Sequence, residues 1–290
     1  MVCNGLRDAV MSNLDINSKK ALVVDIDGTL LNSKKEITPA TAEAIRQVLL
    51  AGHEVVIASG RPLPGMRKCG RELQLKEYGG YLLSYNGAKV INCKNEEVIF
   101  EKTLPANIPA EIYEYAKAHG AGVVSFEGDC VISGFEPNEY VKLEAKHNGL
   151  DIKVIDNFPE YIDFPVNKCM IMDEGDKDAL YEKELLEKYG DSLSIYRSEV
   201  YFLEIMHAGI SKSETLDAIL PVLGVKRENT ICCGDSYNDI SMIEYAGVGV
   251  AMGNAKPEVK AVADYITATN DEDGLVEVIN KFILNGEDNE

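Results

Sequence analysis

Two aspartates, Asp25 and Asp27, stand between an unbroken apolar run over 21–24 and the glycine Gly28. Such a run is typical of a strand that is buried on both faces, as in a parallel sheet. Side chains two positions apart on a strand point to the same side, so the two carboxylates would repel each other unless a cation or a shared proton compensates. Mg²⁺ is a hard ion that takes oxygen ligands. The pair therefore indicates a metal site, and the alternative is a solvated strand end followed by a turn.

Other polar side chains follow the ends of later predicted strands. Ser59 comes directly after the apolar stretch over 54–58, and Asp235 ends a second such stretch over 230–234. In open α/β sheets, ligands bind at the edge where the carboxyl ends of the parallel strands meet. Residues far apart in the chain can therefore converge. Those expected at this edge are Asp25, Asp27, Ser59, Lys212, Asp235 and Asp239.

Strand and helix patterns alternate in two separate parts of the chain. Near the start, predicted helices over 40–51 and 63–75 separate three predicted strands, and the alternation resumes at about residue 201. This order predicts an α/β fold with a Rossmann-like, doubly wound parallel sheet, built from residues 1–87 and 198–290. Residues 88–197 lack strict alternation and have the composition of an α+β domain. They predict an insertion that splits the α/β domain into two segments.

Length, charge and cysteine usage narrow the class of protein. A chain of 290 residues predicts about two domains at roughly 150 residues each. Its net charge of −19 would repel nucleic acids and anionic membranes, so we expect neither as a partner. No apolar run is long enough to span a bilayer. The seven cysteines show no C-x-x-C spacing, which favours free thiols in a reducing compartment and hence a cytoplasmic protein. The oligomeric state cannot be read from the sequence.

Four motifs in a fixed order resemble those of the haloacid dehalogenase-like hydrolase superfamily. They are DIDGTLL from Asp25, ASGRP from Ala58, GISKSETL from Gly209 and GDSYND from Gly234. The insertion lies between the second and third motifs, which is similar to the class IIB cap of the Cof-type subfamily. Further stretches, YNGA, YFLEI and MIEYAGVGVAMGNA, resemble the YidA-like sugar phosphatases. One departure is Ser213, since the motif lysine of these relatives is usually followed by glycine.

This resemblance implies a Mg²⁺-dependent phosphatase that acts on sugar phosphates or similar small phosphomonoesters. Asp25 would be the nucleophile that forms an aspartyl-phosphate, and Asp27 would act first as general acid and then as general base. Phosphoryl transfer depends mainly on positioning and charge stabilisation, which the other motif residues would supply. The expected Mg²⁺ ligands are Asp25, Asp235 and the backbone carbonyl of Asp27. Ser59 and Asn238 would contact the phosphoryl group, Lys212 would offset its charge, and Asp239 would orient Lys212 or a metal-bound water.

Three other functions use similar residues. A phospho-acceptor switch such as a receiver module also combines acidic residues, a hydroxyl and a lysine, but it is shorter and has no inserted domain. A catalytically idle sensor of phosphosugars would keep binding without turnover. A phosphomutase usually carries a smaller cap at another place. We therefore expect a phosphatase, and an assay of turnover distinguishes it from the sensor.

Three charged residues outside the motifs carry weaker expectations. Lys168 lies in an otherwise largely apolar stretch, and we expect a solvent-facing lysine on a strand rather than a contact with the substrate. Glu204 is expected at a strand end, where it would bond the backbone at a hinge between the domains. For Arg61, a structural ion pair and a substrate contact are equally favoured.

Overall fold

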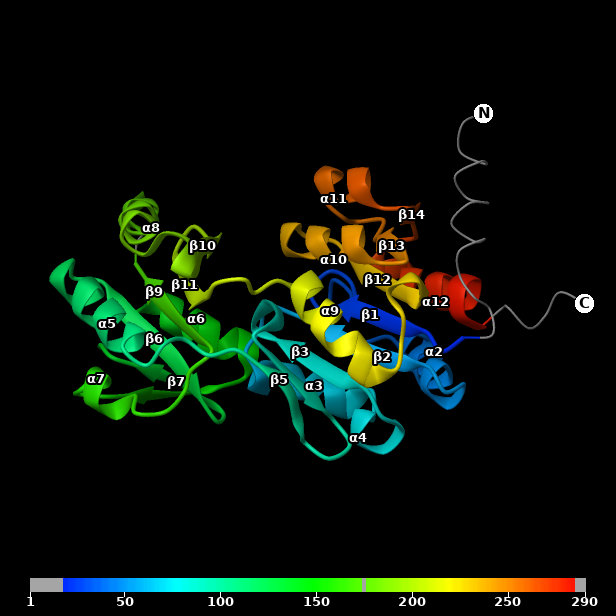
Figure 1. Ribbon diagram of the computed structural model, residues 1–290, viewed down its shortest axis with the longest axis horizontal. Helices are drawn as coiled ribbons and strands as arrows, with labels where there is room; N and C mark the ends of the chain where they lie inside the picture. Colours follow the sequence, from blue (N-terminus) through cyan, green and yellow to red (C-terminus); the bar gives the residue numbers. More distant parts are fainter. Residues whose placement is uncertain (1–17, 174–175, 285–290) are drawn as a thin grey trace, which may run out of the picture. The chain divides into compact units, whose positions relative to one another are not determined.

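The computed structural model describes residues 18–173 and 176–284. They form two compact units, each with its own sheet (Figure 1). The first unit contains residues 18–60, 67–100 and 211–284, and the second contains residues 61–66 and 101–210 apart from the two undescribed positions. The second unit is thus an insertion in the chain of the first.

The first unit is built on an eight-stranded sheet with the order β14-β13-β12-β1-β2-β3-β4-β5. The strands from β14 to β3 are parallel to their neighbours, and β4 is antiparallel to β3. The predicted Rossmann-like parallel sheet is therefore confirmed. The strands are β1 (Ala21–Asp25), β2 (Glu54–Ala58), β3 (Tyr81–Ser84), β4 (Lys89–Asn92), β5 (Val98–Glu101), β12 (Thr230–Gly234), β13 (Val248–Ala251) and β14 (Tyr265–Ile266).

Burial explains why the central strands read as unbroken apolar runs. Every residue of β1 and β12 is buried, and so are four of the five in β2. Strands in this position are covered on both faces, so no alternation with polar residues survives. The polar residues come only where the strands end, which places them together at one edge of the sheet.

Helices cover this sheet in two groups. In the strand order, β2 lies on one side of β1, whereas β13 lies on the opposite side of β12. Connections between parallel strands are right-handed. The helices α2 and α10, which make these two connections, therefore lie on opposite faces of the sheet. The packing agrees, since α2 contacts α4 and α12 whereas α10 contacts α9 and α11. The helices are α2 (Pro39–Leu50), α3 (Leu63–Glu72), α4 (Leu75–Tyr78), α9 (Lys212–Leu223), α10 (Ile240–Tyr245), α11 (Pro257–Val262) and α12 (Gly274–Ile279).

The start of α2 shows how local sequence sets these helices. Thr38 has an extended backbone, and its side chain accepts a hydrogen bond from the backbone N–H of Thr41. Pro39 occupies the first turn, where its missing N–H costs nothing. Thr41, Ile45 and Val48 then follow at helical spacing and are buried. The predicted helix over 40–51 is thus present, and it begins one residue earlier, at Pro39.

The second unit is an α+β domain with a six-stranded sheet of order β10-β11-β9-β6-β7-β8. All neighbouring strands are antiparallel except β7 and β8. The strands are β6 (Gly122–Glu127), β7 (Cys130–Ser133), β8 (Asp151–Val154), β9 (Lys168–Met172), β10 (Leu193–Glu199) and β11 (Phe202–His207). The helices are α5 (Ile108–Ala118), α6 (Glu139–Asn148), α7 (Phe158–Tyr161) and α8 (Asp176–Tyr189).

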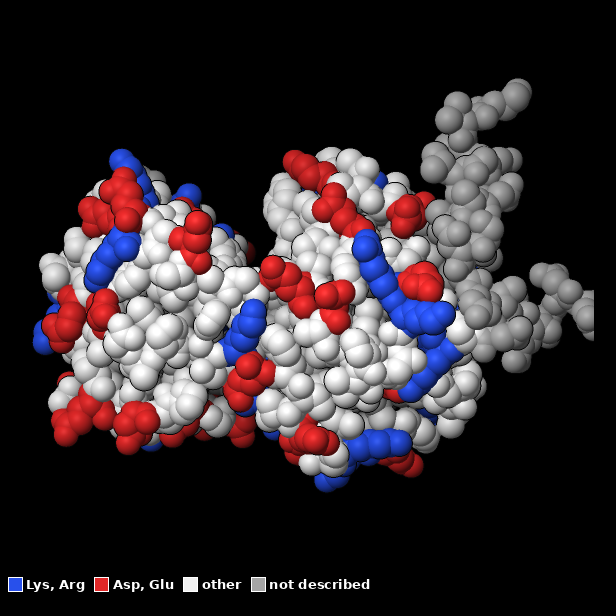
Figure 2. All heavy atoms as spheres, in the orientation of Figure 1, with Lys and Arg blue, Asp and Glu red and all other residues white. Residues whose placement is uncertain are grey.

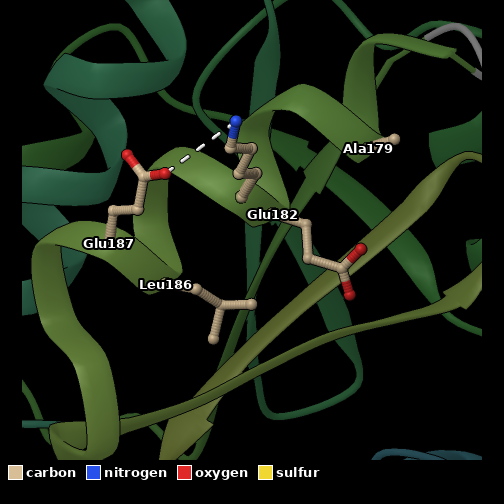
Figure 3. Close-up of a pocket in the computed structure, with 5 residues that line it drawn as sticks. Ala179, Glu182, Leu186 and Glu187 are labelled. Carbon is tan, nitrogen blue, oxygen red and sulfur yellow. Dashed lines mark ion pairs between the residues drawn. The ribbon is translucent and has the colours of Figure 1, made fainter.

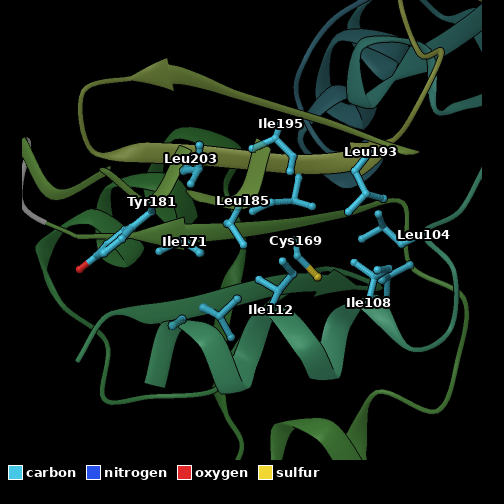
Figure 4. Close-up of a cluster of buried hydrophobic side chains, with 14 of the residues drawn as sticks. Leu104, Ile108, Ile112, Cys169, Ile171, Tyr181, Leu185, Leu193, Ile195 and Leu203 are labelled. Atoms are coloured by element: carbon cyan, nitrogen blue, oxygen red, sulfur yellow. The ribbon is translucent and has the colours of Figure 1, made fainter. Parts of the chain in front are cut away.

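One face of this second sheet holds its hydrophobic core (Figure 4). Alternate residues of the central strands, Cys169 and Ile171 on β9 and Leu203 on β11, point into it. Helix α5 contributes Ile108 and Ile112 from the other side. Because side chains alternate along a strand, the residues between these must face the opposite side of the sheet.

The predicted boundaries of the insertion are wrong at both ends. The sequence places its start at residue 88, but residues 89–101 form β4 and β5, which extend the sheet of the first unit. An antiparallel hairpin can form the edge of a mostly parallel sheet, or it can begin a new domain. The strand pattern of residues 89–101 is the same in both cases, so it does not show to which domain they belong. The second unit ends at Ile210, not at residue 197, because β11 belongs to the six-stranded sheet. Helix α6 and strands β8 and β10 were not predicted.

The expectations for Lys168 and Glu204 are also wrong. Lys168 is only 2% exposed, and its Nζ lies 3.4 Å from Oε1 of Glu204, which stands in the middle of β11. The Lys168 ammonium also lies over the ring of Phe126, and the hydroxyl of Tyr196 donates to Oε2 of Glu204 at 3.1 Å. Burial raises the pKa of the nearby Glu144, although the charge of Lys168 opposes this. The face opposite the hydrophobic core therefore contains a buried cluster of charges.

Arg61 makes a structural contact in the second unit. Its guanidinium Nη1 donates to the backbone carbonyl of His147, at the end of α6, over 3.4 Å.

The six described cysteines are all free thiols, five of them buried, while Cys3 lies outside the described residues. Acidic side chains are spread over both units on the face drawn in Figure 2. Among the described residues, no helix is long and apolar enough to cross a membrane.

The buried pair between Lys168 and Glu204 gives a test of stability. Lys168→Met leaves two buried carboxylates without their cation and should lower the free energy of unfolding by about 3–5 kcal/mol. The double variant Lys168→Met/Glu204→Gln removes one of these charges but keeps an acceptor for Tyr196, so it should recover at least about 1 kcal/mol. Calorimetric unfolding measures both.

A matched control is the ion pair of Lys183 and Glu187 on α8, whose side chains are more than two-thirds exposed. Its disruption by Glu187→Gln should change stability by less than about 0.5 kcal/mol. If the double variant proved as unstable as Lys168→Met, the loss would come from packing and not from charge.

Candidate active site

Neighbouring strand ends bring the predicted residues together. Asp25, the last residue of β1, is opposite Ala58 on β2, so Ser59 is the next residue along that neighbouring strand. On the other side of β1, Val24 is opposite Cys233 on β12, and Asp235 lies two residues beyond. The three strands run in the same direction, and their polar ends therefore share one edge of the sheet.

Lys212 is the residue that links these ends. Its side chain is fully buried, and its Nζ lies 2.7 Å from Oδ1 of Asp25 and 2.6 Å from Oδ1 of Asp239. The same ammonium donates to the backbone carbonyl of Ala58 at 3.1 Å. Burial opposes the charge on Lys212, but Asp239 and then Asp25 more than offset this, so the pKa of Lys212 lies above its usual value. The lysine is therefore a cation held between two carboxylates.

The start of α9 sets the position of this lysine. Ser211 caps the helix, because its hydroxyl accepts from the backbone N–H of Glu214 at 3.2 Å. Ser213, which departs from the family motif, has its hydroxyl 3.0 Å from that of Ser211 and leaves the helix start at Lys212 unchanged. One turn later, Thr215 donates to the carbonyl of Gly87 in the turn after β3. The cap thus fixes where the helix begins, and Thr215 anchors its first turn to the turn after β3.

Asp25 and Asp235 carry charges that the protein alone does not compensate. Burial, and next the charge of Asp239, raise the pKa of Asp25 to about 8, although Lys212 lowers it. Burial and the charge of Asp239 also raise the pKa of Asp235 to about 6, which a hydrogen bond from Thr29 opposes. The raised pKa values indicate that one lysine does not fully offset the burial and mutual repulsion of these carboxylates. A divalent cation would supply the remaining positive charge.

The donor set fits such an ion. One carboxylate oxygen each from Asp25, Asp235 and Asp239 lie within 4.8 Å of one another. Asp239 already uses both of its oxygens, since Oδ2 accepts from the backbone N–H groups of Asp235 and Ser236 and Oδ1 bonds Lys212. Asp25 and Asp235 are therefore the better ligands. Asp239 holds the loop and the lysine in place.

Gly28 makes room for one of these carboxylates. A Cβ at this position would lie 2.4 Å from Oδ2 of Asp235, closer than any real contact allows. Its φ of +84° is also in the region that favours glycine. The hydroxyl of Thr29 donates to Oδ1 of Asp235 at 3.1 Å. The turn after β1 therefore holds a carboxylate that follows β12.

The Asp27 carboxylate lies outside the three-carboxylate cluster. Its side chain is 40% exposed, and its Oδ1 accepts from the ammonium of Lys35 at 3.0 Å. The sequence placed Asp27 beside Asp25 on one side of a strand, but β1 ends at Asp25 and a turn follows. A carboxylate that is partly open to solvent suits proton exchange better than metal binding.

Ser59 and Asn238 are connected through a residue that the sequence analysis missed. The backbone N–H of Asn86 donates to the carbonyl of Ser59 at 2.9 Å, and its side-chain oxygen accepts from the amide of Asn238 at 3.0 Å. Asn86 has a left-handed backbone with φ of +52°. The sequence signalled only a turn at this Asn-Gly pair. Asn86, Thr29 and Lys35 are therefore additions to the predicted site.

A depression on α8 does not resemble this site. It is lined by Ala179, Glu182, Lys183, Leu186 and Glu187, which lie along one exposed side of a single helix of the second unit (Figure 3). Lys183 and Glu187 form an exposed ion pair. The depression includes none of the predicted site residues, and the strand-end cluster is the better candidate.

Comparisons with known proteins agree with this geometry. The family model for haloacid dehalogenase-like hydrolases matches residues 22–279. A crystal structure of such a hydrolase from Bacteroides thetaiotaomicron is 41% identical with a TM-score of 0.87, and the match covers 91% of this chain and 99% of that one. The subclass IIB sugar phosphatase BT4131 is 31% identical with a TM-score of 0.77, over 91% and 99% of the two chains.

A curated relative from Bacillus subtilis, the 5-amino-6-(5-phospho-D-ribitylamino)uracil phosphatase YcsE, is 32% identical over 267 residues, which are 91% of this chain and 96% of that protein. The predicted motifs, the fold and the relatives therefore agree. The chain belongs to the haloacid dehalogenase-like hydrolase family, and it is an enzyme that hydrolyses phosphoric monoesters.

Proposed function

We propose that this enzyme is a Mg²⁺-dependent phosphatase of sugar phosphates or similar small phosphomonoesters and works through an aspartyl-phosphate. The observation that carries the proposal is the buried ammonium of Lys212, held between Asp25 and Asp239 beside Asp235. This arrangement sets a nucleophilic carboxylate, a cation and two further carboxylates at one strand edge. It is what stabilisation of a charged phosphoryl group requires.

Hydrolysis proceeds in two steps. In the first, a carboxylate oxygen of Asp25 attacks phosphorus, the bond to the leaving oxygen breaks, and Asp27 gives that oxygen its proton. In the second, Asp27 takes a proton from water, the water oxygen attacks phosphorus, and the bond to Asp25 breaks to release inorganic phosphate. Asp27 ends with its proton restored, and Asp25 is a carboxylate again.

Other side chains hold the reacting groups. Lys212 orients Asp25 and offsets the charge on the phosphoryl oxygens, while Asp239 fixes Lys212. The hydroxyl of Ser59 and the amide of Asn238 donate to the phosphoryl group. The carboxylates of Asp25 and Asp235 and the carbonyl of Asp27 would hold Mg²⁺, which would supply positive charge against the repulsion between nucleophile and substrate.

Two relatives support the substrate class. One is named a sugar phosphatase, and the name of another contains a phosphorylated ribityl chain. Both substrates carry phosphate on a chain or ring with several hydroxyl groups. The buried free thiols of this chain support the expected cytoplasmic location. The acidic net charge supports the expectation of no nucleic-acid partner.

A screen against a panel of sugar phosphates tests the proposal. The wild-type enzyme should release phosphate from some members with Mg²⁺ and lose more than about 100-fold in rate with EDTA, because the charge on the phosphoryl group is then unbalanced. Asp25→Asn keeps the shape of the side chain and should abolish turnover without unfolding the protein. Binding without turnover in the wild type would favour a sensor, and hydrolysis by Asp25→Asn would remove its role as nucleophile.

The Asp27→Asn variant should affect substrates differently according to whether their leaving group needs a proton. The variant cannot protonate a leaving alkoxide, so kcat/KM for glycerol 2-phosphate should fall by about 100-fold or more. For p-nitrophenyl phosphate, whose leaving group needs no proton, the fall should be much smaller. Steady-state kinetics measure the ratio. Equal losses with both substrates, and no trapped phosphoenzyme, would exclude Asp27 as the acid and base.

The second unit is proposed to determine which phosphomonoester is used. It contains none of the residues assigned to phosphoryl transfer, most of it is the single segment over 101–210, and it has its own hydrophobic core. Its exchange for the corresponding unit of a relative with other preferences should change the ranking of sugar phosphates. Dependence on Mg²⁺ and on Asp25 should stay. A folded chimera with the original ranking would show that specificity lies in the first unit.

A further inference from the structure

The turn over 32–36, which follows the first motif, is held by several hydrogen bonds. The side-chain oxygen of Asn32 accepts from the backbone N–H groups of Lys34 and Glu36, each at 3.0 Å. The N–H of Ser33 donates to Asp271 at 2.8 Å, which ties the turn to the segment after β14. The backbone of Lys35 is therefore set by its neighbours and not by its own side chain.

That backbone is unusual for a lysine. Lys35 has a φ of +61°, in the left-handed region where a side chain causes strain and glycine or asparagine is preferred. Strained residues of this kind persist where the surrounding structure imposes them and are frequent at functional sites. A glycine would fit this turn better than the residue present.

The ammonium of Lys35 points to the first motif. Its Nζ donates to Oδ1 of Asp27 at 3.0 Å, and the two side chains are 66% and 40% exposed. Ion pairs as exposed as this one contribute little to stability. Neither the backbone conformation nor the stability of the fold therefore explains a lysine at position 35. Its contact with Asp27, the proposed general acid and base, does explain it.

We propose that Lys35 is a positioning residue that fixes the orientation of the Asp27 carboxylate for proton transfer, which rests on the function proposed above. The hydrogen bond to Oδ1 restrains rotation of the carboxylate. The oxygen that gives its proton to the leaving group, and later takes one from water, is then presented in a constant direction. Lys35 touches neither the phosphoryl group nor the metal in this assignment.

The test compares two substrates and four variants. Lys35→Met removes the ammonium and should lower kcat/KM for glycerol 2-phosphate by about tenfold, but that for p-nitrophenyl phosphate by less than about twofold, because only the first needs a well-placed proton. Lys35→Gly should show the same two losses in kcat/KM. Its Tm should be unchanged or higher, since glycine suits the turn. Lys35→Arg keeps a hydrogen-bond donor, so its kcat/KM for glycerol 2-phosphate should be close to that of the wild type.

Lys34→Met is the matched control, because Lys34 is an exposed lysine of the same turn with an ordinary backbone. It should leave both substrates unaffected. If the wild type is active but Lys35→Met or Lys35→Gly loses kcat/KM equally with both substrates, the role of Lys35 is merely structural. That result would overturn the inference. If the wild type hydrolysed neither phosphate, the proposed function would fail and this inference with it.

Discussion

The rest of the first unit depends on one buried cation, the ammonium of Lys212, which lies between the carboxylates of Asp25 and Asp239. Charges taken out of water are costly, and such a group persists only when every partner is in place. The partners come from three elements, namely the end of β1, the end of β2 and the loop after β12. Loss of Lys212 itself would leave the buried carboxylates of Asp25 and Asp239 without their cation. The architecture of the sheet edge is therefore set by this interaction as much as by the apolar strands.

The same region contains more negative than positive charge. Three carboxylates surround one lysine, and two of them have raised pKa values in the protein alone. A fold selected for stability alone would avoid this excess. Active sites are the places where such local conflicts are retained, and in the proposed function the missing positive charge would come from the metal ion. The glycine beside Asp235 serves the same end, since it allows a second carboxylate close to the first strand.

Sequence patterns predicted the parts of the fold that follow from burial. Strands covered on both faces leave long apolar runs, and the residues after them must meet at one edge, so Asp25, Ser59 and Asp235 could be placed together without a structure. Contacts that depend on the path of a loop could not be predicted. Asn86 reaches Asn238 only because of a left-handed turn, and Lys35 reaches Asp27 for the same reason. Lys168 illustrates a different limit, since a single lysine in an apolar strand gives no sign of the glutamate that pairs with it from another strand.

The order of the strands also has a consequence for synthesis on the ribosome. Asp25 and Lys212 are 187 residues apart in the chain, and the partner of β1 on one side, β12, is made later still. Until β12 emerges, the fully buried strand β1 has an unpaired edge, which is a template for aggregation. The intervening insertion can fold on its own meanwhile, as domains generally do, and then brings the two parts of the sheet together at little further entropic cost. The nascent chain therefore cannot complete the Lys212 site before the whole insertion has been synthesised, and until then the edge of β1 stays exposed.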